Sequence, residues 1–313
     1  MPLSLDEIIP YLCCPDDLAT LLQYSGGLRC VRCHRTYSLQ SRNILELLPS
    51  RPVAFPEARE LKPYREGYQQ EFFRPLEIRE DAEAWGAPEA VSRRWGRLRA
   101  RQAREALQFL RDWRRESELI YCDLSAGAGY CTFEAAREYR LVFHCDLSVD
   151  SLAYASAKAK TKHLENIVFV RADYFQPPFR NSIHRLTCLD TLIRGPWHEA
   201  RLLGSIQTIL ANSGVAVVDF HNWWHNPLRR LGLLRDNFSG NKSYTRKELG
   251  SLLASSGIGQ FQTQPFVQEL DPVHMPGKVF ARFIPPTRLM VRLVRGNAPL
   301  MQTAARRWRE SKT

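Results

Sequence analysis

The feature that most constrains the fold is a regular alternation of short apolar runs with helical stretches from residue 119 onward. Helical stretches separate the first five runs, and alternation at this spacing predicts a parallel, doubly wound α/β sheet. No clear helix lies between the last two runs, so we expect them to pair antiparallel at one edge. The sequence therefore predicts a mostly parallel, seven-stranded sheet. The predicted strands are Leu119–Ser125, Leu141–Leu147, Ile167–Asp173, Arg185–Leu192, Gly214–Phe220, Phe261–Val267 and Lys278–Ile284.

A turn of small residues follows the first predicted strand, where the chain reads Asp123-Leu-Ser-Ala-Gly127-Ala-Gly129. The glycines allow the backbone to approach a ligand beyond the strand ends. The next strand ends in Asp146, where an acid can accept hydrogen bonds from both ribose hydroxyls of a nucleoside cofactor. A dinucleotide site would need a third glycine, and Thr132 occupies that position.

The turn resembles the first motif of class I S-adenosylmethionine-dependent methyltransferases, commonly Asp-Leu-Gly-x-Gly-x-Gly, with Ser125 in place of the first glycine. Further motifs follow in the order of that family, and the resemblance spans about residues 118–285. It implies a Rossmann-like methyltransferase fold with S-adenosyl-L-methionine as cofactor. The cofactor-binding residues implied by the resemblance are Asp123, Ser125, Gly127, Gly129, Asp146, Leu147, Asp173, Tyr174 and Asp190.

Two of these acids have a second interpretation. Asp173 would meet the adenine amino group in the resemblance, but an acid at a strand end also caps the following turn. Asp190 would contact the cofactor, or it would simply end its strand.

The loop after the fifth predicted strand carries the candidates for acting on the methyl acceptor. It reads Asp219-Phe-His221-Asn-Trp223-Trp224-His225. His221 or His225 would remove a proton from an acceptor hydroxyl, and the two tryptophans would wall an aromatic or apolar acceptor. His198, after the fourth strand, is a third catalytic candidate. The alternative is an aromatic loop in which these histidines have no catalytic role.

Two cysteine-containing turns near the N-terminus have the spacing of a metal site. Each offers a pair of ligands, in Cys14-Pro-Asp-Asp17 and in Cys30-Val-Arg-Cys33. A closed tetrahedral zinc site is built from two such turns, and carboxylates can take the place of thiolates. We therefore expect Cys14, Asp17, Cys30 and Cys33 to bind Zn²⁺. Cys13 and His34 are reserve ligands.

Residues 8–49 resemble the short zinc-ribbon domain at the N-terminus of many bacterial methyltransferases, which is related to the small activator subunit of tRNA and protein methyltransferases. The shared features include Tyr37 and the closing Leu47-Leu48-Pro49. Asp17 departs from the family, which has cysteine there. A ribbon that has lost its metal and folds on its small apolar core is the alternative.

The chain has 44 Lys and Arg against 33 Asp and Glu, which gives a formal net charge of +11. Hydrophobic residues make up 44% and charged residues 25%, values that exclude wholesale disorder. No apolar run approaches the ~20 residues that span a bilayer, and the first residues lack the basic cluster of a secretory signal, so we expect a cytoplasmic protein. From Lys278 onward the chain has nine basic residues and one acid, a tail for docking on nucleic acid or an anionic membrane surface.

These features divide the chain into four parts. Residues 1–50 form a zinc-ribbon-like domain, and 51–87 a linker rich in aromatic residues and proline that packs on the main domain. Residues 88–285 form the S-adenosylmethionine-binding methyltransferase domain, which opens with a helix from about Pro88 to Trp113, and 286–313 form a basic C-terminal tail.

The sequence-based hypothesis is a methyltransferase that acts on an O, N or C nucleophile of a small-molecule or lipid-like acceptor. For a lipid-like acceptor, the segment Thr287–Val294 would anchor the protein at the inner face of the membrane. The first alternative is an RNA methyltransferase acting on rRNA or tRNA bases, with which the positive charge agrees. The second is a non-catalytic scaffold with a methyltransferase fold. The oligomeric state is left open.

Overall fold

Five parallel strands form the centre of the sheet, in the spatial order β7-β6-β5-β8-β9. The first five predicted strands are confirmed, and β9 runs on at both ends beyond its predicted bounds. Buried residues occupy nearly every position of these strands, as expected where helices cover both faces of a parallel sheet. Their bounds are β5 Ile120–Leu124, β6 Leu141–Asp146, β7 Ile167–Arg171, β8 Ile183–Leu192 and β9 Leu210–Asn222. The computed structural model describes residues 4–40, 44–51, 89–192, 195–223, 242–266 and 288–295.

An antiparallel pair extends the sheet beyond β9, as predicted, but its second strand is not the predicted one. β12 (Arg288–Val294) lies between β9 and β11 (Phe261–Phe266), and β10 (Ser243–Tyr244) pairs with the end of β9. The predicted strand Lys278–Ile284 lies outside the described residues.

The prediction that Thr287–Val294 belongs to a basic tail and anchors the protein on a membrane was wrong for the described part of that segment. β12 is an interior strand, because it forms hydrogen-bonded ladders with β9 on one side and β11 on the other. Its apolar residues Leu289 to Val291 and Leu293 are buried, and its two arginines are buried with them. Arg288 and Arg292 therefore do not form an exposed basic surface.

At the opposite edge, the sheet continues into the N-terminal residues. β4 pairs in parallel with β7, and β1, β2 and β3 continue from β4 as antiparallel strands. The prediction of seven strands was therefore wrong, because the described sheet has twelve. The bounds are β1 Leu21–Tyr24, β2 Gly27–Cys30, β3 Thr36–Gln40 and β4 Ile44–Glu46.

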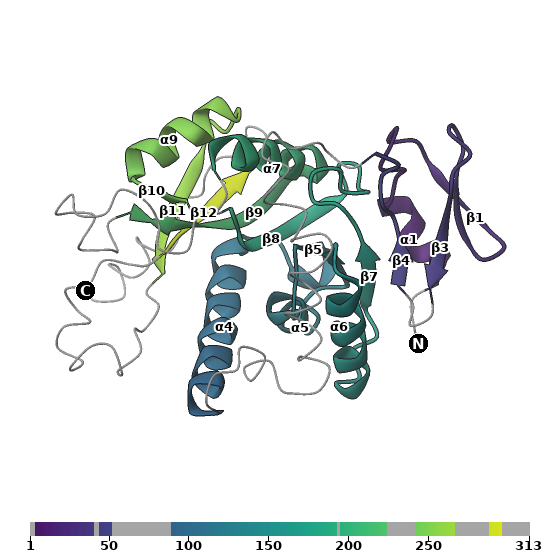
Figure 1. The fold of residues 1–313 in the computed structure, drawn as a ribbon, viewed down its shortest axis with the longest axis horizontal. Helices are drawn as coiled ribbons and strands as arrows, with labels where there is room; N and C mark the ends of the chain where they lie inside the picture. Colours follow the sequence, from purple (N-terminus) through teal and green to yellow (C-terminus); the bar gives the residue numbers. More distant parts are fainter. Residues whose placement is uncertain are drawn as a thin grey trace.

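Helices cover both faces of the sheet (Figure 1). Helices α4, α5 and α6 lie on one face, and α7 and α9 lie on the other. This confirms the predicted doubly wound arrangement, and α4 confirms the predicted long helix. The helices are α1 Leu5–Ile8, α4 Glu89–Leu110, α5 Tyr130–Ala135, α6 Val149–Thr161, α7 Pro196–Ile209 and α9 Arg246–Ser255, with 3₁₀ turns at Ile9–Tyr11 and Glu116–Glu118. None of the described helices is long and apolar enough to cross a membrane.

Local sequence explains where two of these helices begin. Thr245 and Glu248 form a capping box at the start of α9, where Thr245 Oγ1 accepts a hydrogen bond from the Glu248 amide and Glu248 Oε2 accepts one from the Thr245 amide. At α6, Ser148 Oγ accepts a hydrogen bond from the Ser151 amide at 3.2 Å. Each cap satisfies amides that the first helical turn leaves without intrahelical partners.

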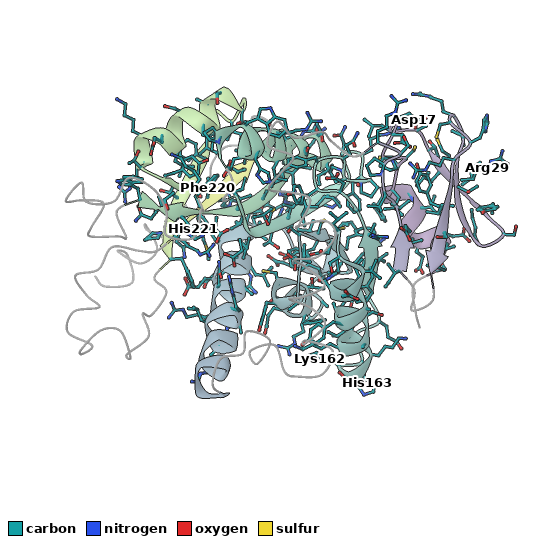
Figure 2. All side chains as sticks on the ribbon, viewed as in Figure 1. Asp17, Arg29, Lys162, His163, Phe220 and His221 are labelled. Carbon is teal, nitrogen blue, oxygen red and sulfur yellow. The ribbon has the colours of Figure 1, made fainter. Side chains whose placement is uncertain are left out.

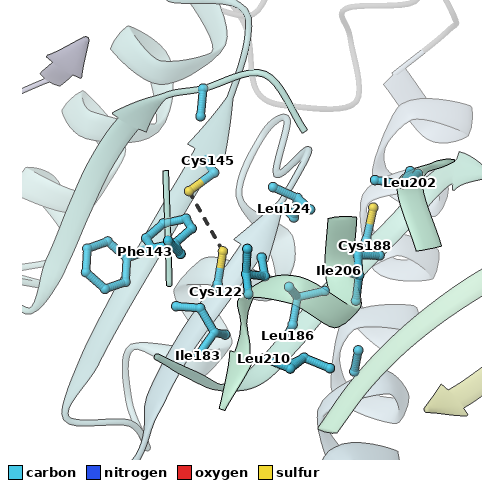
Figure 3. Packing of buried hydrophobic residues seen from close by; sticks show 14 of the residues in the cluster. Cys122, Leu124, Phe143, Cys145, Ile183, Leu186, Cys188, Leu202, Ile206 and Leu210 are labelled. Carbon is cyan, nitrogen blue, oxygen red and sulfur yellow. Dashed lines mark hydrogen bonds between the residues drawn. The ribbon is translucent and has the colours of Figure 1, made fainter. Parts of the chain in front are cut away.

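The core on the face toward α7 and α9 contains three of the four cysteines that lie outside the N-terminal turns. Figure 3 shows Cys122, Cys145 and Cys188 among Leu186, Ile206 and their neighbours. All three cysteines are buried and free, and the sulfur atoms of Cys122 and Cys145 lie 3.8 Å apart. They act as small apolar residues of the core.

The N-terminal residues dock on the segment that follows β7. The Cys13 amide donates a hydrogen bond to the Pro178 carbonyl at 2.9 Å, and Leu12 forms a β-bridge with Phe179. Glu46 Oε1 also accepts an ion-paired hydrogen bond from Arg171 Nη1 at 2.6 Å. The contacts tie the N-terminal strands to the larger domain. The predicted linker lies almost wholly outside the described residues, and its packing stays a prediction.

Candidate functional site

The turn between β5 and α5 has a backbone that explains its small residues. Gly127 and Gly129 both have positive φ, at 53° and 80°. A Cβ on Gly129 would lie 3.0 Å from the Phe133 ring and 3.4 Å from His144 Cε1. Ser125 also has positive φ, at 62°, in the position where the resembling family has glycine. A left-handed conformation costs a non-glycine residue about 1–2 kcal/mol, so the turn holds Ser125 against its own preference.

Asp146 lies at the end of β6, directly beside this turn. Its Oδ2 accepts a hydrogen bond from the Gly127 amide at 2.8 Å, and its Oδ1 accepts one from the Ser148 amide at 2.9 Å. Burial raises the pKa of this carboxyl, and the two amides act in the opposite direction. Each carboxylate oxygen has a second lone pair, so the fixed carboxylate retains the capacity to accept ribose hydroxyls. The residues therefore fit an adenosine-containing cofactor.

Asp123 lies near the end of β5, and its carboxyl group accepts hydrogen bonds from two threonines. Thr132 donates to its Oδ2 from the amide at 2.9 Å and from Oγ1 at 2.7 Å, and Thr187 Oγ1 donates to its Oδ1 at 2.9 Å. Burial raises the pKa of Asp123 to about 7. The contacts give Asp123 a positioning role, in which it ties the start of α5 to β8.

The hydrogen-bond chain continues on both sides of Asp123. Thr132 Oγ1 and His144 Nδ1 lie 2.8 Å apart, and burial lowers the pKa of His144 to about 3, so its ring is neutral. On the other side, the Tyr121 hydroxyl hydrogen-bonds Thr187 Oγ1. Sequence reasoning missed both threonines, because nothing in their local pattern distinguishes them from other buried polar residues.

Asp173 and Tyr174 follow β7. Asp173 Oδ1 accepts a hydrogen bond from the Phe175 amide at 2.9 Å, which is the turn-capping role that the sequence offered as the alternative. The Tyr174 hydroxyl lies 3.0 Å from His198 Nε2. Because His198 is 5% exposed, it is suited to positioning Tyr174 and not to acting on an acceptor in solvent. Leu147, between this pair and the turn, has its carbonyl bound by Arg171 Nε.

Asp190 belongs to a closed ring of charged and polar side chains. Its carboxylate forms ion pairs with Arg99 of α4 and Arg288 of β12, and its amide donates to Asp219 Oδ1 at 2.7 Å. Asp219 Oδ2 accepts from Arg288 Nη1 at 2.7 Å and from Gln102 Nε2 at 2.9 Å. Gln102 Oε1 closes the ring by accepting from Arg99 Nη1 at 3.0 Å.

The ring joins α4 to three interior strands, β8, β9 and β12. It lies near the carboxyl ends of β8 and β9. Asp190 has a positive φ of 60° and lies within a register shift between β8 and β9. It therefore does not simply end its strand, and each of its carboxylate oxygens forms an ion pair with an arginine. The sequence showed its members as a surface helix, a strand end and a basic tail, and only the fold brings them together.

The candidates for acting on the acceptor are only partly described. His221 is half-buried near the end of β9, where it pairs in register with Ser243 and Arg288. Trp223 is also half-buried, whereas Trp224 and His225 lie outside the described residues. Figure 2 shows His221 beside Phe220 at one end of the sheet, far from Asp17 in the N-terminal strands.

Those N-terminal strands bring together all four predicted metal ligands, Cys14, Asp17, Cys30 and Cys33. Their donor atoms lie within 4.8 Å of one another. The Cys14 and Cys33 sulfur atoms are 3.7 Å apart, and Cys30 Sγ lies 3.5 Å from Asp17 Oδ1. Neither reserve ligand, Cys13 nor His34, belongs to this cluster.

Backbone amides and a phenol surround the cluster. The amides of Arg32 and Cys33 donate to Cys30 Sγ at 3.3 and 3.4 Å, and they lower its pKa although burial acts in the opposite direction. The Tyr37 hydroxyl lies 3.0 Å from Cys14 Sγ. Three thiols and a carboxylate at this separation are a donor set that suits tetrahedral Zn²⁺.

Known proteins match the larger domain. Residues 122–214 match a family model described as a methyltransferase domain, and no curated protein matches the sequence. Among solved structures, the fold is similar to magnesium protoporphyrin IX methyltransferase from Synechocystis PCC 6803. The crystal structure of that enzyme with bound S-adenosylhomocysteine has 14% identity and a TM-score of 0.55, with 76% of this chain and 99% of that chain covered. Its structure with bound S-adenosylmethionine has 13% identity and a TM-score of 0.54, with 79% and 100% covered.

The likeness to the solved structures establishes the fold, and the family match places a methyltransferase domain on the segment that contains Gly127, Gly129 and Asp146. The chain therefore has the fold of these methyltransferases, and its residues 122–214 match a methyltransferase domain.

Proposed function

We propose that this protein transfers the methyl group of S-adenosylmethionine to a nucleophilic O, N or C atom of a small-molecule acceptor. The observation that carries the proposal is the junction of Gly127 and Asp146, where a turn with positive φ holds a buried carboxylate by a 2.8 Å hydrogen bond. This junction lies at the ends of β5 and β6, where open α/β sheets bind their ligands.

Different residues of the junction bind different parts of the cofactor. Asp146 accepts the ribose hydroxyls, and the backbone of the turn approaches the remainder of the nucleoside and its amino-acid part. Asp123, through Thr132, fixes where α5 begins and therefore where the turn ends. When bound, S-adenosylmethionine supplies an electrophilic methyl group on its sulfonium.

Methyl transfer requires the acceptor atom to lie in line with the bond that breaks, so positioning supplies much of the rate. An O or N acceptor must also lose a proton, which needs a base within hydrogen-bond reach. His221 is our candidate for this base among the described residues, because it lies on β9 two strands from β5. His198 instead holds Tyr174.

An aromatic surface beside the proposed cofactor site supports a planar or apolar acceptor. Trp197, at the start of α7, is 44% exposed, and its ring lies 6.5 Å from that of Phe175. The guanidinium of Arg201 lies 6.0 Å from both ring centres. Phe175 is buried, so the Trp197 ring with its neighbouring cation is the flat surface on which a conjugated acceptor can stack. A lipid-like acceptor would have to bind without the anchor predicted at Thr287–Val294, because β12 is buried.

Binding of the cofactor tests the proposal most directly. We expect calorimetry to detect S-adenosylmethionine binding to the wild-type protein, at least tenfold weaker binding to Asp146→Ala, and unchanged binding to Asp150→Ala. Asp150 is the matched control because it lies four residues later, on α6. His221→Ala is expected to bind cofactor normally and to lose turnover. Absence of binding to the wild type would instead favour the non-catalytic scaffold.

We further propose that Cys14, Asp17, Cys30 and Cys33 bind Zn²⁺ in a zinc-ribbon-like domain. The convergence of four donor atoms within 4.8 Å supports it, as do the two amides directed at Cys30 Sγ. Elemental analysis of the purified protein is expected to give one zinc per chain, lost in Cys30→Ser and retained in Cys13→Ser. A wild-type protein purified without any zinc would overturn this assignment.

An RNA acceptor is the second candidate, and one face of α4 favours it. Arg97 and Arg104 are exposed and lie seven residues apart, which places them on the same side of the helix, and the exposed Arg111 directly follows its last residue. Such a row can contact phosphates. Copurifying RNA that is released by salt, together with methylation of that RNA, would favour this function over a small-molecule acceptor.

A further inference from the structure

Two buried arginines and a half-buried one gather near the amino-terminal end of β8, at the end of the parallel strands opposite the proposed cofactor site. Arg185 lies near the start of β8, and Arg292 lies near the end of the antiparallel strand β12. Arg114 follows α4. The side chain of Arg185 is fully buried, Arg292 is 8% exposed, and the Arg114 side chain is 17% exposed.

A single carboxylate, that of Asp112, pairs with two of them. Its Oδ1 accepts a hydrogen bond from Arg185 Nη2 at 2.7 Å, and its Oδ2 accepts one from Arg114 Nη2 at 2.8 Å. Backbone carbonyls take further donors of the same arginines: Ser213 accepts from Arg114, and His184 accepts from Arg185. Asp112 is therefore already shared between two guanidinium groups.

Arg292 differs from the other two, because its side chain has no hydrogen bond or ion pair within the described part of the chain. Arg292 lies opposite Val217 of β9, and Arg185 lies opposite Val215 of the same strand, so both arginines project from the same face of the sheet. Asp112 attracts the charge of Arg292, whereas Arg185 and Arg114 repel it. Burial is the largest cause that lowers the pKa of both Arg292 and Arg185. The Arg292 guanidinium therefore has no direct counterion among the described residues, an arrangement that favours a further anion.

The neighbouring groups do not supply that anion. Glu116 is only half-buried and acts on Arg185 from beyond hydrogen-bond distance. His184 accepts the Ile120 amide at its Nδ1, and the positive charge of Arg114 and Arg185 adds to burial in lowering its pKa. The three arginines, Asp112 and Glu116 thus leave one uncompensated positive charge.

Two more buried groups beside Arg185 have no partner among the described residues, namely its own Nε and the Tyr139 hydroxyl. The Tyr139 side chain interacts electrostatically with Arg185, and its ring packs against that of Tyr121 at 5.0 Å. Both groups are hydrogen-bond donors, as is every polar atom of Arg292. An excess of donors together with an excess of positive charge matches an acceptor-rich anion.

We propose that Arg292, Arg185 and Arg114 bind a small oxyanion, either inorganic phosphate or the phosphoryl group of a small metabolite. The planar guanidinium group binds oxyanions through paired N–H donors, which a chloride ion cannot use in the same way. The site is separate from the proposed methyl-transfer site, because it lies at the start of β8 and Asp190 lies near its end. It does not depend on the proposed function.

Unfolding of the wild-type protein in different salts tests the proposal. Chemical unfolding is measured in potassium chloride, inorganic phosphate, sulfate and methyl phosphate at matched ionic strength. We expect saturable stabilisation by the oxyanions, so that phosphate at ten times its dissociation constant lowers the unfolding equilibrium constant about 11-fold. Saturation at a lower concentration of methyl phosphate than of inorganic phosphate would identify the phosphoryl group of a metabolite as the natural ligand. Equal stability in all four salts would overturn the proposal.

Arg292→Met and Arg111→Met form a matched pair of variants, since Arg111 is an exposed arginine paired with Glu138. We expect Arg292→Met to be at least as stable as the wild type in chloride, because it removes an uncompensated buried charge. The same variant loses the response to phosphate, whereas Arg111→Met retains it. A full phosphate response in Arg292→Met would contradict the site. If that variant does not fold, Arg292→Lys replaces it, and an undiminished phosphate affinity there would count equally against the proposal.

Discussion

Substitution of Asp123 by asparagine is expected to remove a pH dependence of stability that this residue creates. Asp123 is 4% exposed, and burial raises its pKa to about 7, whereas an unfolded chain has a value near 3.9. The native state therefore binds a proton that the unfolded state releases between these two values. In that window the free energy of unfolding falls as pH rises.

The magnitude follows from the two pKa values. With about 7 in the folded state and 3.9 in the unfolded state, the contribution of Asp123 to the unfolding free energy falls by about 3 kcal/mol between about pH 5 and about pH 8. Asparagine does not titrate in this range. If its Nδ2 takes the place of Oδ1, it donates a hydrogen bond to Thr187 Oγ1, and the Thr187 hydroxyl then donates to the Tyr121 oxygen. The hydrogen bonds from Thr132 to Oδ2 are retained.

Urea unfolding at both pH values, for the wild type and Asp123→Asn, measures the effect. Other titrating groups are common to both proteins, so the difference between them isolates Asp123. We expect the stability of the variant relative to the wild type to increase by about 3 kcal/mol from about pH 5 to about pH 8. A difference that is the same at both pH values would show that Asp123 ionises normally, and the assignment of a buried, largely neutral carboxyl would be refuted.

Three further substitutions test other parts of the structure by the same unfolding assay or by calorimetry. Gly129→Ala is expected to lower stability by about 1–2 kcal/mol and to weaken cofactor binding, because its φ of 80° and the Phe133 ring both oppose a Cβ. Ser125→Gly is expected to relieve a left-handed conformation and to leave stability unchanged or higher by up to about 1 kcal/mol, with cofactor affinity retained. Asp219→Ala is expected to lower stability by about 3–5 kcal/mol, because it leaves Arg288 buried with half of its partners; a loss below about 1 kcal/mol would contradict the closed ring.

The elements that could be predicted from the sequence are those whose local residue pattern directly reflects their environment in the fold. The parallel strands are continuous apolar runs because helices cover both of their faces, and this pattern is visible without the fold. The metal ligands were predictable for a similar reason, since Cys14 and Asp17 lie within one turn and Cys30 and Cys33 within another. Only the pairing of the two turns required the fold.

Long-range pairing of charges was not predictable. β12 reads Arg-Leu-Met-Val-Arg-Leu-Val, which the sequence presents as a basic surface segment. It is an interior strand because Asp190 and Asp219, from β8 and β9, supply counterions for Arg288. The same pairing gives both carboxylate oxygens of Asp190 an arginine partner, and no local motif could indicate it.

The two arginines of β12, Arg288 and Arg292, differ in their counterions, and this difference indicates why position 292 carries an arginine. They lie four residues apart on one strand, so their side chains project from the same face of the sheet. Arg288 has two carboxylates, whereas Arg292 shares the single carboxylate of Asp112 with Arg114 and Arg185 and has no hydrogen bond to it among the described residues. If both arginines served only to complete the fold, an apolar residue would be equally effective at position 292 and would avoid the cost of an uncompensated charge. An arginine at position 292 is therefore better explained by an anion that arrives from outside the chain.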